Sequence, residues 1–162
     1  MSALTPVTRA VHHDTGLLVR RVLVALTAIR IAAAAFELYS KRHWNGLEQL
    51  VPWVALAVLA VATVLVLLPG GGGRTAARVL ALLVLAASAY GVVDHVLVKY
   101  GSAVLDQRYA DTWDSLPALT RWWYAASNRW APAPTLAPGV LGQTAALLLL
   151  ATVGRPLRFT AR

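Results

Sequence analysis

The sequence contains no cysteine and few charged residues. Without cysteine, disulfides, thiolate metal sites and cysteine nucleophiles are excluded. Charged residues make up 14% of the 162 positions, hydrophobic residues make up 58%, and the mean hydropathy is +0.60. Soluble domains have about 25% charged and about 45–50% apolar residues. The composition therefore indicates an integral membrane protein.

The sequence also lacks the short motifs of common soluble enzymes. It has no Gly-x-Ser-x-Gly elbow, Walker motif or Rossmann fingerprint, and no Lys-Ser/Thr pair follows the glycine run at 70–73 in phosphate-binding spacing. Acidic residues number seven against 15 Lys and Arg, giving a net charge of +8. The basic residues flank apolar segments, so anionic lipid headgroups are the expected counter-charge and nucleic acid is not an expected partner.

Four apolar segments are long enough, or nearly so, to cross a bilayer as helices. They cover residues 17–39, 51–68, 78–98 and 136–153. We therefore predict an all-α fold, an integral membrane four-helix bundle that forms one domain at 17–154 between cytoplasmic tails at 1–16 and 155–162. Pro52 is expected in the first turn of the second span, where its missing N–H is harmless. Pro69 and the four glycines after it predict a flexible linker.

The outer loop, 99–135, is too polar to span and too apolar to be a disordered tail. Leu105, Tyr109, Trp113 and Leu116 recur at the spacing of an amphipathic helix. Ser115 and Pro117 then resemble the cap and first turn of a second short helix. We expect the two helices to form an interfacial hairpin on the outer face of the membrane.

The distribution of basic residues predicts the orientation. With four spans, both termini lie on one side, together with eight arginines, whereas the other side has six lysines and arginines. The positive-inside rule then favours cytoplasmic termini in a bacterial cytoplasmic membrane. All six tryptophans fall on the outer side. That side therefore has the larger amphipathic contact surface.

Arg30 is a charged residue near the middle of the first apolar segment. A charge at this depth costs about 3 kcal/mol on insertion scales, so its face must contact protein or trapped water. We expect a carboxylate or several polar acceptors beside it, with Glu37 or Asp94 as the favoured partner. The outer ends of the spans add further polar residues, and the predicted intramembrane cluster is Arg30, Glu37, Tyr90, Asp94, His95 and Gln143.

Three interpretations of this cluster stay open. The acids and His95 can serve only to balance Arg30 and to cap helix ends. Alternatively, Glu37, His43, Asp94 and His95 can ligate a metal ion, or the two histidines a haem, although no Glu-x-x-His or His-Glu-x-x-His motif is present. Thirdly, Arg30 and Glu37 can line a proton or substrate path. No catalytic residue is identified.

The outer aromatic residues have two interpretations. They are interfacial anchors, or they form a surface that docks a quinone, a lipid or a protein partner. The residues of this predicted interface are Trp113, Trp122, Trp123, Tyr124 and Trp130.

Two short pieces of the sequence resemble small four-span bacterial membrane proteins of unassigned function. These pieces are Glu37-Leu38-Tyr39 with His43, and residues 135–139 at the start of the fourth segment. The resemblance implies a four-span layout and no particular activity.

The chain is small, it has no complete set of catalytic groups, and its tryptophans fall on one side of the predicted membrane. We therefore expect an accessory or structural subunit of an envelope or respiratory complex, with a protein partner or a second copy. The alternatives are a metal- or haem-binding redox protein or enzyme, and a small proton-coupled transporter.

Overall fold

The computed structural model describes residues 6–127 and 137–153, with the side chains of 16–127 and 138–153. All its regular elements are helices, which confirms the predicted all-α class. In chain order they are α1 (Pro6–Ser40), α2 (Leu47–Leu67), α3 (Gly71–Ser102), the short 3₁₀ helices η1 (Ala103–Leu105) and η2 (Trp113–Ser115), α4 (Ala118–Ser127) and α5 (Ala137–Ala151).

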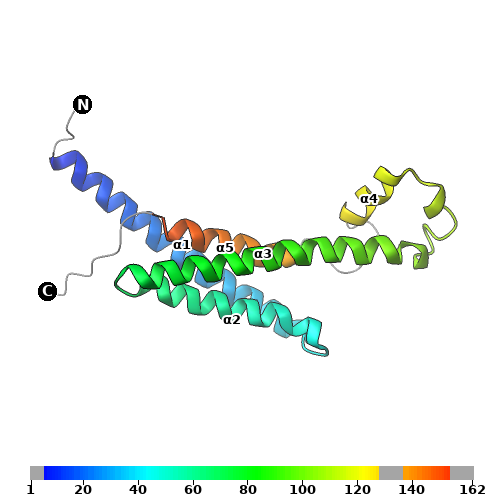
Figure 1. Cartoon of the computed structure of the whole chain (residues 1–162), viewed down its shortest axis with the longest axis horizontal. Helices are drawn as coiled ribbons and strands as arrows, with labels where there is room; N and C mark the ends of the chain where they lie inside the picture. The colour runs from blue at the N-terminus through cyan, green and yellow to red at the C-terminus, as the bar shows by residue number, and fades with distance from the viewer. Residues whose placement is uncertain (1–5, 128–136, 154–162) are drawn as a thin grey trace.

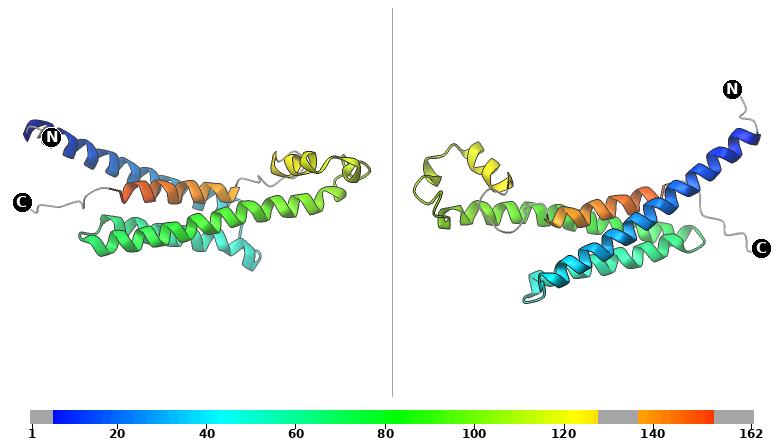
Figure 2. Two further views of the ribbon diagram at one scale, coloured as in Figure 1. Left: turned by 45° about the horizontal axis from the view of Figure 1, so that its top comes forward. Right: turned by 180° about the vertical axis from the view of Figure 1, so that it is seen from behind.

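The helices α1, α2, α3 and α5 pack against one another in an elongated, splayed arrangement, which we call the bundle (Figure 1). Both α2 and α5 pack against α1 and α3, running antiparallel to them. Three segments, Gly16–Ser40, Leu47–Leu67 and Gly71–Leu105, are long and apolar enough to cross a membrane. The fourth apolar segment forms α5, whose 15 residues extend about 22 Å, less than the ~30 Å of a hydrocarbon core. The first turns of α1 and the last part of α3 project beyond the bundle in opposite directions (Figure 2).

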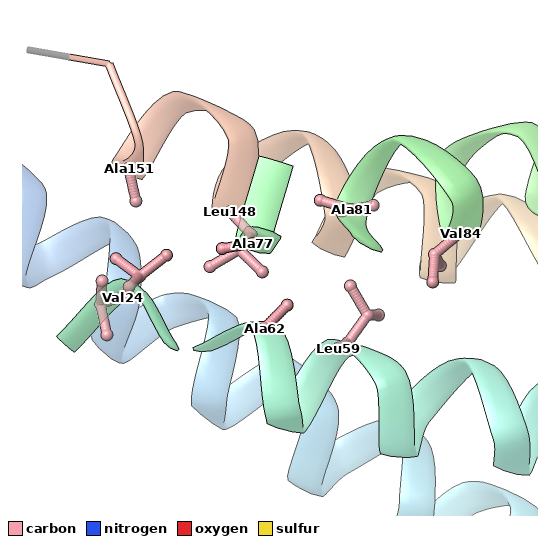
Figure 3. Packing of buried hydrophobic residues seen from close by; sticks show 10 residues of the cluster. Val24, Leu59, Ala62, Ala77, Ala81, Val84, Leu148 and Ala151 are labelled. Carbon is pink, nitrogen blue, oxygen red and sulfur yellow. The ribbon is translucent and has the colours of Figure 1, made fainter. Parts of the chain in front are cut away.

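The core of the bundle is built from small side chains. Its buried residues come from all four helices, and half of the ten are alanine, including Ala62, Ala77 and Ala81 (Figure 3). Small residues let helix backbones approach closely, as is usual where lipid surrounds a bundle. Buried hydroxyls bond within their own helix: Thr27 Oγ1 donates to the Leu23 carbonyl and Thr63 Oγ1 to the Leu59 carbonyl. These two hydroxyls are thereby satisfied within their own helices.

A Schellman motif ends α1 and begins the turn to α2. The His43 N–H donates to the Leu38 carbonyl and the Arg42 N–H to the Tyr39 carbonyl. Arg42 occupies the position that usually holds glycine and has a φ of 50°. The turn is also fixed to α2, because the Trp53 indole N–H donates to the His43 carbonyl at 2.8 Å.

The junction between α2 and α3 differs from the predicted flexible linker. Only residues 68–70 form the turn, with Gly70 at a φ of 109°, and α3 already begins at Gly71. A Cβ on Gly73 would lie 2.7 Å from the Leu65 carbonyl oxygen, so this glycine permits a close contact between the two helices. Likewise α2 begins at Leu47, which makes Pro52 its sixth residue and not part of its first turn. Its missing N–H therefore costs the Glu48 carbonyl an intrahelical bond.

The outer loop folds back on the end of α3, beyond the turn between α1 and α2 (Figure 1). The second predicted short helix is confirmed as α4, which contains Trp122, Trp123 and Tyr124. The first predicted helix of the hairpin is wrong, because residues 106–112 form turns between η1 and η2. The apolar spacing had a different cause: Tyr109, Trp113 and Leu116 pack around a small core that requires no continuous helix.

Candidate functional site

Arg30 connects α1 to α5 through two neutral side chains. Its Nη2 donates to the Gln143 amide oxygen at 2.7 Å, and its Nε donates to Thr144 Oγ1 at 3.3 Å. Thr144 in turn donates to the Val140 carbonyl, which fixes the direction of its lone pairs. The acceptors beside Arg30 are thus two neutral groups of α5, and not the favoured carboxylates of Glu37 or Asp94.

Glu37 is on the same helix as Arg30 but pairs with another cation. Its carboxylate forms an ion pair with Lys41, one turn further along α1, and both side chains are 57% exposed. Residues four apart on a helix are close neighbours, whereas seven residues separate Glu37 from Arg30 by about 10 Å of axial rise. This spacing explains why Glu37 leaves Arg30 without a carboxylate.

The other members of the predicted cluster lie on the outward part of α3. Tyr90 is 72% exposed, Asp94 is exposed and His95 is half-buried. Ser88 and Gly91 already face Pro138 in the first turn of α5, so Asp94 lies past the described start of that helix. Of the six predicted residues, the structure brings Arg30 and Gln143 into contact by hydrogen bonding.

The proposed metal ligands are Glu37, His43, Asp94 and His95. Within residues 16–127 and 138–153, no group of three or more His, Cys, Asp or Glu side chains is arranged to hold a metal ion. His43 lies in the turn after α1, and its contact there is made by the backbone carbonyl. Its imidazole is half-buried. A metal or haem site gains no support from this geometry.

Two further arginines bind the C-terminal ends of neighbouring helices. Arg20 of α1 is buried and donates to the Val66 carbonyl in the last turn of α2 at 3.0 Å. Arg78 of α3 donates to both the carbonyl and the hydroxyl of Thr152, just after α5, at 2.7 and 3.0 Å. Neither α2 nor α5 has a basic residue in its own last turn. The neighbouring helices therefore supply the cations that complement these negative dipole ends.

Sequence analysis did not identify these two capping arginines. The available signal was the lack of a basic residue in the last turns of α2 and α5, opposite arginines near the start of the apolar segment Gly16–Ser40 and the start of α3. Arg74 also lies close enough to Arg20 for their charges to repel. The end of the bundle that holds Arg20, Arg74 and Arg78 is therefore positively charged.

An aromatic cluster holds the outer loop to the end of α3. Trp113 is 3% exposed and packs edge-on against Tyr100 of α3 at 5.4 Å between ring centroids. Trp122 of α4 also stacks on Tyr100, with 4.4 Å between the ring centroids. Tyr109 contacts both Trp113 and Tyr124. We call residues 103–127, together with the α3 residues they contact, the outer lobe.

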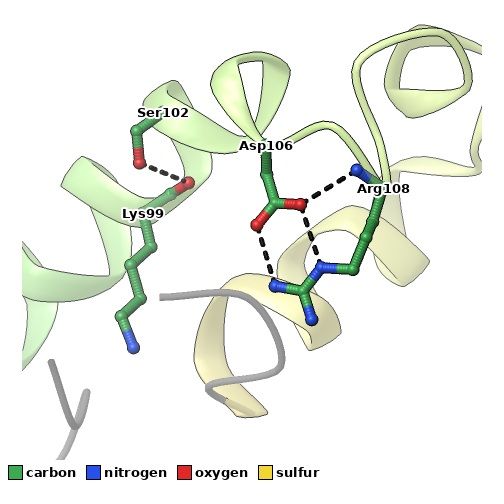
Figure 4. Close-up of polar contacts among 4 residues, drawn as sticks. All are labelled: Lys99, Ser102, Asp106 and Arg108. Carbon is green, nitrogen blue, oxygen red and sulfur yellow. Dashed lines mark hydrogen bonds and ion pairs between the residues drawn. The ribbon is translucent and has the colours of Figure 1, made fainter. Parts of the chain in front are cut away.

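A bidentate ion pair organises the turn inside the outer lobe. Arg108 donates from Nε and Nη2 to the two carboxylate oxygens of Asp106, at 3.0 and 2.8 Å, and its backbone N–H donates to the same group (Figure 4). Hydrogen bonds from Arg108 lower the pKa of Asp106 to about 2, and the side-chain bond contributes more than the backbone bond. The turn is consequently held by a carboxylate that stays ionised well below neutral pH.

The predicted aromatic interface is partly internal. Trp113 is buried in the outer lobe, so it cannot contribute to a docking surface, which corrects that prediction. Tyr124 is half-buried, and Trp122 uses one face on Tyr100. Trp123 is 63% exposed and lies one turn from the exposed Leu119, so these two form an outward apolar face on α4. Trp130 lies outside the described residues.

Comparison with known proteins does not extend this description. No protein-family model, curated protein or solved structure matches the chain.

Proposed function

We propose that the chain is a four-span protein of the bacterial cytoplasmic membrane, with both termini in the cytoplasm. Three helices have the length and hydropathy of spans. A fourth span is supported by α5, which packs in the same bundle with Ala145 and Leu148 fully buried. The proposed span, 136–153, extends α5 at both ends.

The outward surfaces and the charge distribution support this placement. Large apolar side chains such as Phe36, Val64 and Leu83 are exposed around the bundle, where lipid would cover them. Arginines 20, 74 and 78 gather near the start of the apolar segment Gly16–Ser40 and the start of α3, the end that the positive-inside rule assigns to the cytoplasm. The outer lobe is then extracytoplasmic.

Within that membrane, we infer an accessory or structural role in an envelope or respiratory complex, with the outer lobe as the docking part. The single observation that carries this proposal is that some aromatic residues of the outer lobe pack inside it while another points away from it. Trp113 and Trp122 build the lobe, whereas Trp123 and Leu119 face outward from it. Exposed apolar groups on a rigid support are typical of protein interfaces.

The length of α3 carries its last turn past the hydrocarbon core. Its 32 residues extend about 48 Å, about 18 Å more than a ~30 Å hydrocarbon core. With the span at 78–98, about 10 Å of this excess precedes the span and about 6 Å follows it. The outer lobe lies at the distal end, beyond the turn between α1 and α2 (Figure 1). Its outward aromatic face is therefore at the outer boundary of the membrane, where another protein can contact it.

The alternatives have weaker support. A metal site needs ligands that converge, and the described His, Asp and Glu side chains form no group of three or more that could hold a metal ion. A proton-coupled transporter that uses Glu37 must explain why this carboxylate is half-exposed and bound by Lys41.

The test compares two leucines of equal exposure on the outer lobe. Leu119 and Leu105 are both 83% exposed, but only Leu119 shares the α4 face with Trp123. The protein is extracted from native membranes in mild detergent, and its mass is measured by light scattering during size-exclusion chromatography. We expect a complex for the wild type and for Leu105→Ser, and a monomer for Leu119→Ser combined with Trp123→Ser. The proposal fails if the wild type is already monomeric. It also fails if Leu105→Ser and the double variant Leu119→Ser/Trp123→Ser have the same mass.

A further inference from the structure

Arg30 lies almost at the centre of its span. Fourteen residues of Gly16–Ser40 precede it and ten follow it, which places it about 21 Å and about 15 Å from the two ends. Arginines near helix ends can extend to the interface, but one at this depth cannot. Arginine also keeps its proton in proteins. A full positive charge is therefore held in the hydrocarbon region.

Among the described residues, Arg30 has neutral hydrogen-bond acceptors but no negatively charged partner. A guanidinium has five N–H donors. Arg30 uses Nε and Nη2 on Thr144 and Gln143, both neutral, and Nη1 donates to none of the described residues. Arg30 and Gln143 also lie at the surface of the bundle, because Gln143 is exposed and Arg30 is only half-buried. The unused donors are thus accessible from outside the bundle.

A second copy of the chain cannot neutralise Arg30. Two copies with the same orientation bring Arg30 to the same depth in both, so the like charges repel. The carboxylate nearest along α1 is Glu37, about 10 Å further out and bound to Lys41. The counter-charge must therefore come from a different molecule.

We propose that the face of α1 and α5 around Arg30 binds a transmembrane helix of another protein that carries Asp or Glu at mid-membrane depth. The carboxylate would accept from Nη1, leaving the bonds to Gln143 and Thr144 intact. Ala33, one turn from Arg30, is small and exposed, so a partner helix can approach closely. A cation and a carboxylate that meet in hydrocarbon each offset part of the cost of burying the other.

An anionic lipid is the main competing occupant. Its phosphate would have to leave the headgroup layer and move about 15 Å toward the middle of the bilayer to reach Arg30. A carboxylate on a helix is already at that depth. This inference rests on the proposed membrane placement but not on docking through the outer lobe.

The test uses model transmembrane peptides with no extramembrane part, so it is independent of the outer lobe. The protein carries a donor dye and is reconstituted in phosphatidylcholine vesicles with an acceptor-labelled Leu-Ala host helix. The peptides carry Asp, Asn or Leu at the central position. We expect energy transfer to report binding of the Asp peptide about tenfold tighter than that of the Leu peptide, with Asn in between.

Protein variants then identify the site. Arg30→Gln should reduce binding of the Asp peptide to the level of the Leu peptide. Arg21→Gln, a change at an exposed arginine on the same helix, should leave it unchanged. Because the peptide series uses wild-type protein throughout, a folding defect in Arg30→Gln cannot produce the expected ranking.

Four outcomes would overturn the proposal. They are equal binding of the Asp and Leu peptides, equal binding of the Asp and Asn peptides, undiminished binding by Arg30→Gln, and loss of Asp-peptide binding when phosphatidylglycerol is added. The last would identify an anionic lipid as the occupant. If the peptides show no such ranking while the variants in Leu119 and Trp123 still dissociate a native complex, only the role of Arg30 is refuted.

Discussion

Gly142 of α5 packs directly against Ser88 of α3. A Cβ at this position would lie 2.5 Å from Ser88 Oγ and 3.2 Å from Ser88 Cβ on α3. Ser88 cannot easily move its hydroxyl, because Oγ donates to the Pro138 carbonyl at 2.6 Å. Gly142→Ala should therefore be destabilising, with an overpacking cost of about 1–3 kcal/mol that exceeds the helix-propensity gain of about 0.5–1 kcal/mol.

A double-mutant cycle separates the steric conflict from other effects. With Ser88→Ala, the Oγ atom is gone and the nearest contact of the new Cβ becomes 3.2 Å, which a shift of a few tenths of an ångström relieves. Gly142→Ala should then be neutral or stabilising, so the two changes should couple by at least about 1 kcal/mol. Gly139→Ala is the matched control on the same helix, since its Cβ would meet Val92 Cγ2 at 3.8 Å.

The free energy of unfolding can be measured by titrating the protein in mild detergent with a denaturing detergent, followed by circular dichroism. We expect Gly139→Ala to unfold at the wild-type midpoint or later, and Gly142→Ala to unfold earlier. The reasoning is refuted if the two alanine variants are equally stable. It is also refuted if Ser88→Ala does not lessen the effect of Gly142→Ala.

Three further outcomes are expected. Arg78→Leu should cost about 1.5–3 kcal/mol, because it removes charged bonds to Thr152, whereas Arg21→Leu should change the free energy of unfolding by less than about 0.5 kcal/mol in the same titration. Arg42→Gly should stabilise by about 1 kcal/mol and Arg42→Ala should not, because only glycine removes the cost of the left-handed backbone. The pKa of Asp106 lies below its ordinary value of about 3.9, so its ion pair should stabilise the turn above about pH 4 and be lost as the pH falls through about 2. A pH titration followed by carboxyl carbon NMR should give this pKa for Asp106, and Arg108→Gln should raise the pKa toward the ordinary value.

Hydropathy predicted the middles of the helices better than their ends. The apolar cores of α1, α2, α3 and α5 fall within the predicted segments, because a continuous apolar run leaves few other structures open to the chain. The start of α3 was different. Glycine has a low helix propensity, yet Gly71 to Gly73 are helical, and at Gly73 the close contact with Leu65 needs a residue without a side chain. Such a tertiary requirement is invisible in a local pattern.

The sequence predicted how deep in the membrane the candidate site lies, but not which neighbouring helix contacts Arg30. Counting residues along a helix locates Arg30 at mid-span, and the cost of a charge there implies polar neighbours. It does not say which helix lies beside α1, nor which face that helix turns inward. Gln143 and Thr144 became the partners because α5 packs on α1 at that level, whereas Glu37 had a closer cation in Lys41.

The arginines of the bundle differ in what their surroundings can offer. Arg20 and Arg78 bind carbonyls at the ends of α2 and α5, where the helix dipole supplies partial negative charge. Arg30 lies beside the middle turns of α5, where backbone carbonyls are already bonded within the helix. Among the described residues, two side chains accept hydrogen bonds from it. Two neutral acceptors match the geometry of part of the guanidinium but not its charge. Arg30 is therefore the arginine for which a role in assembly, and not capping, accounts best for its position.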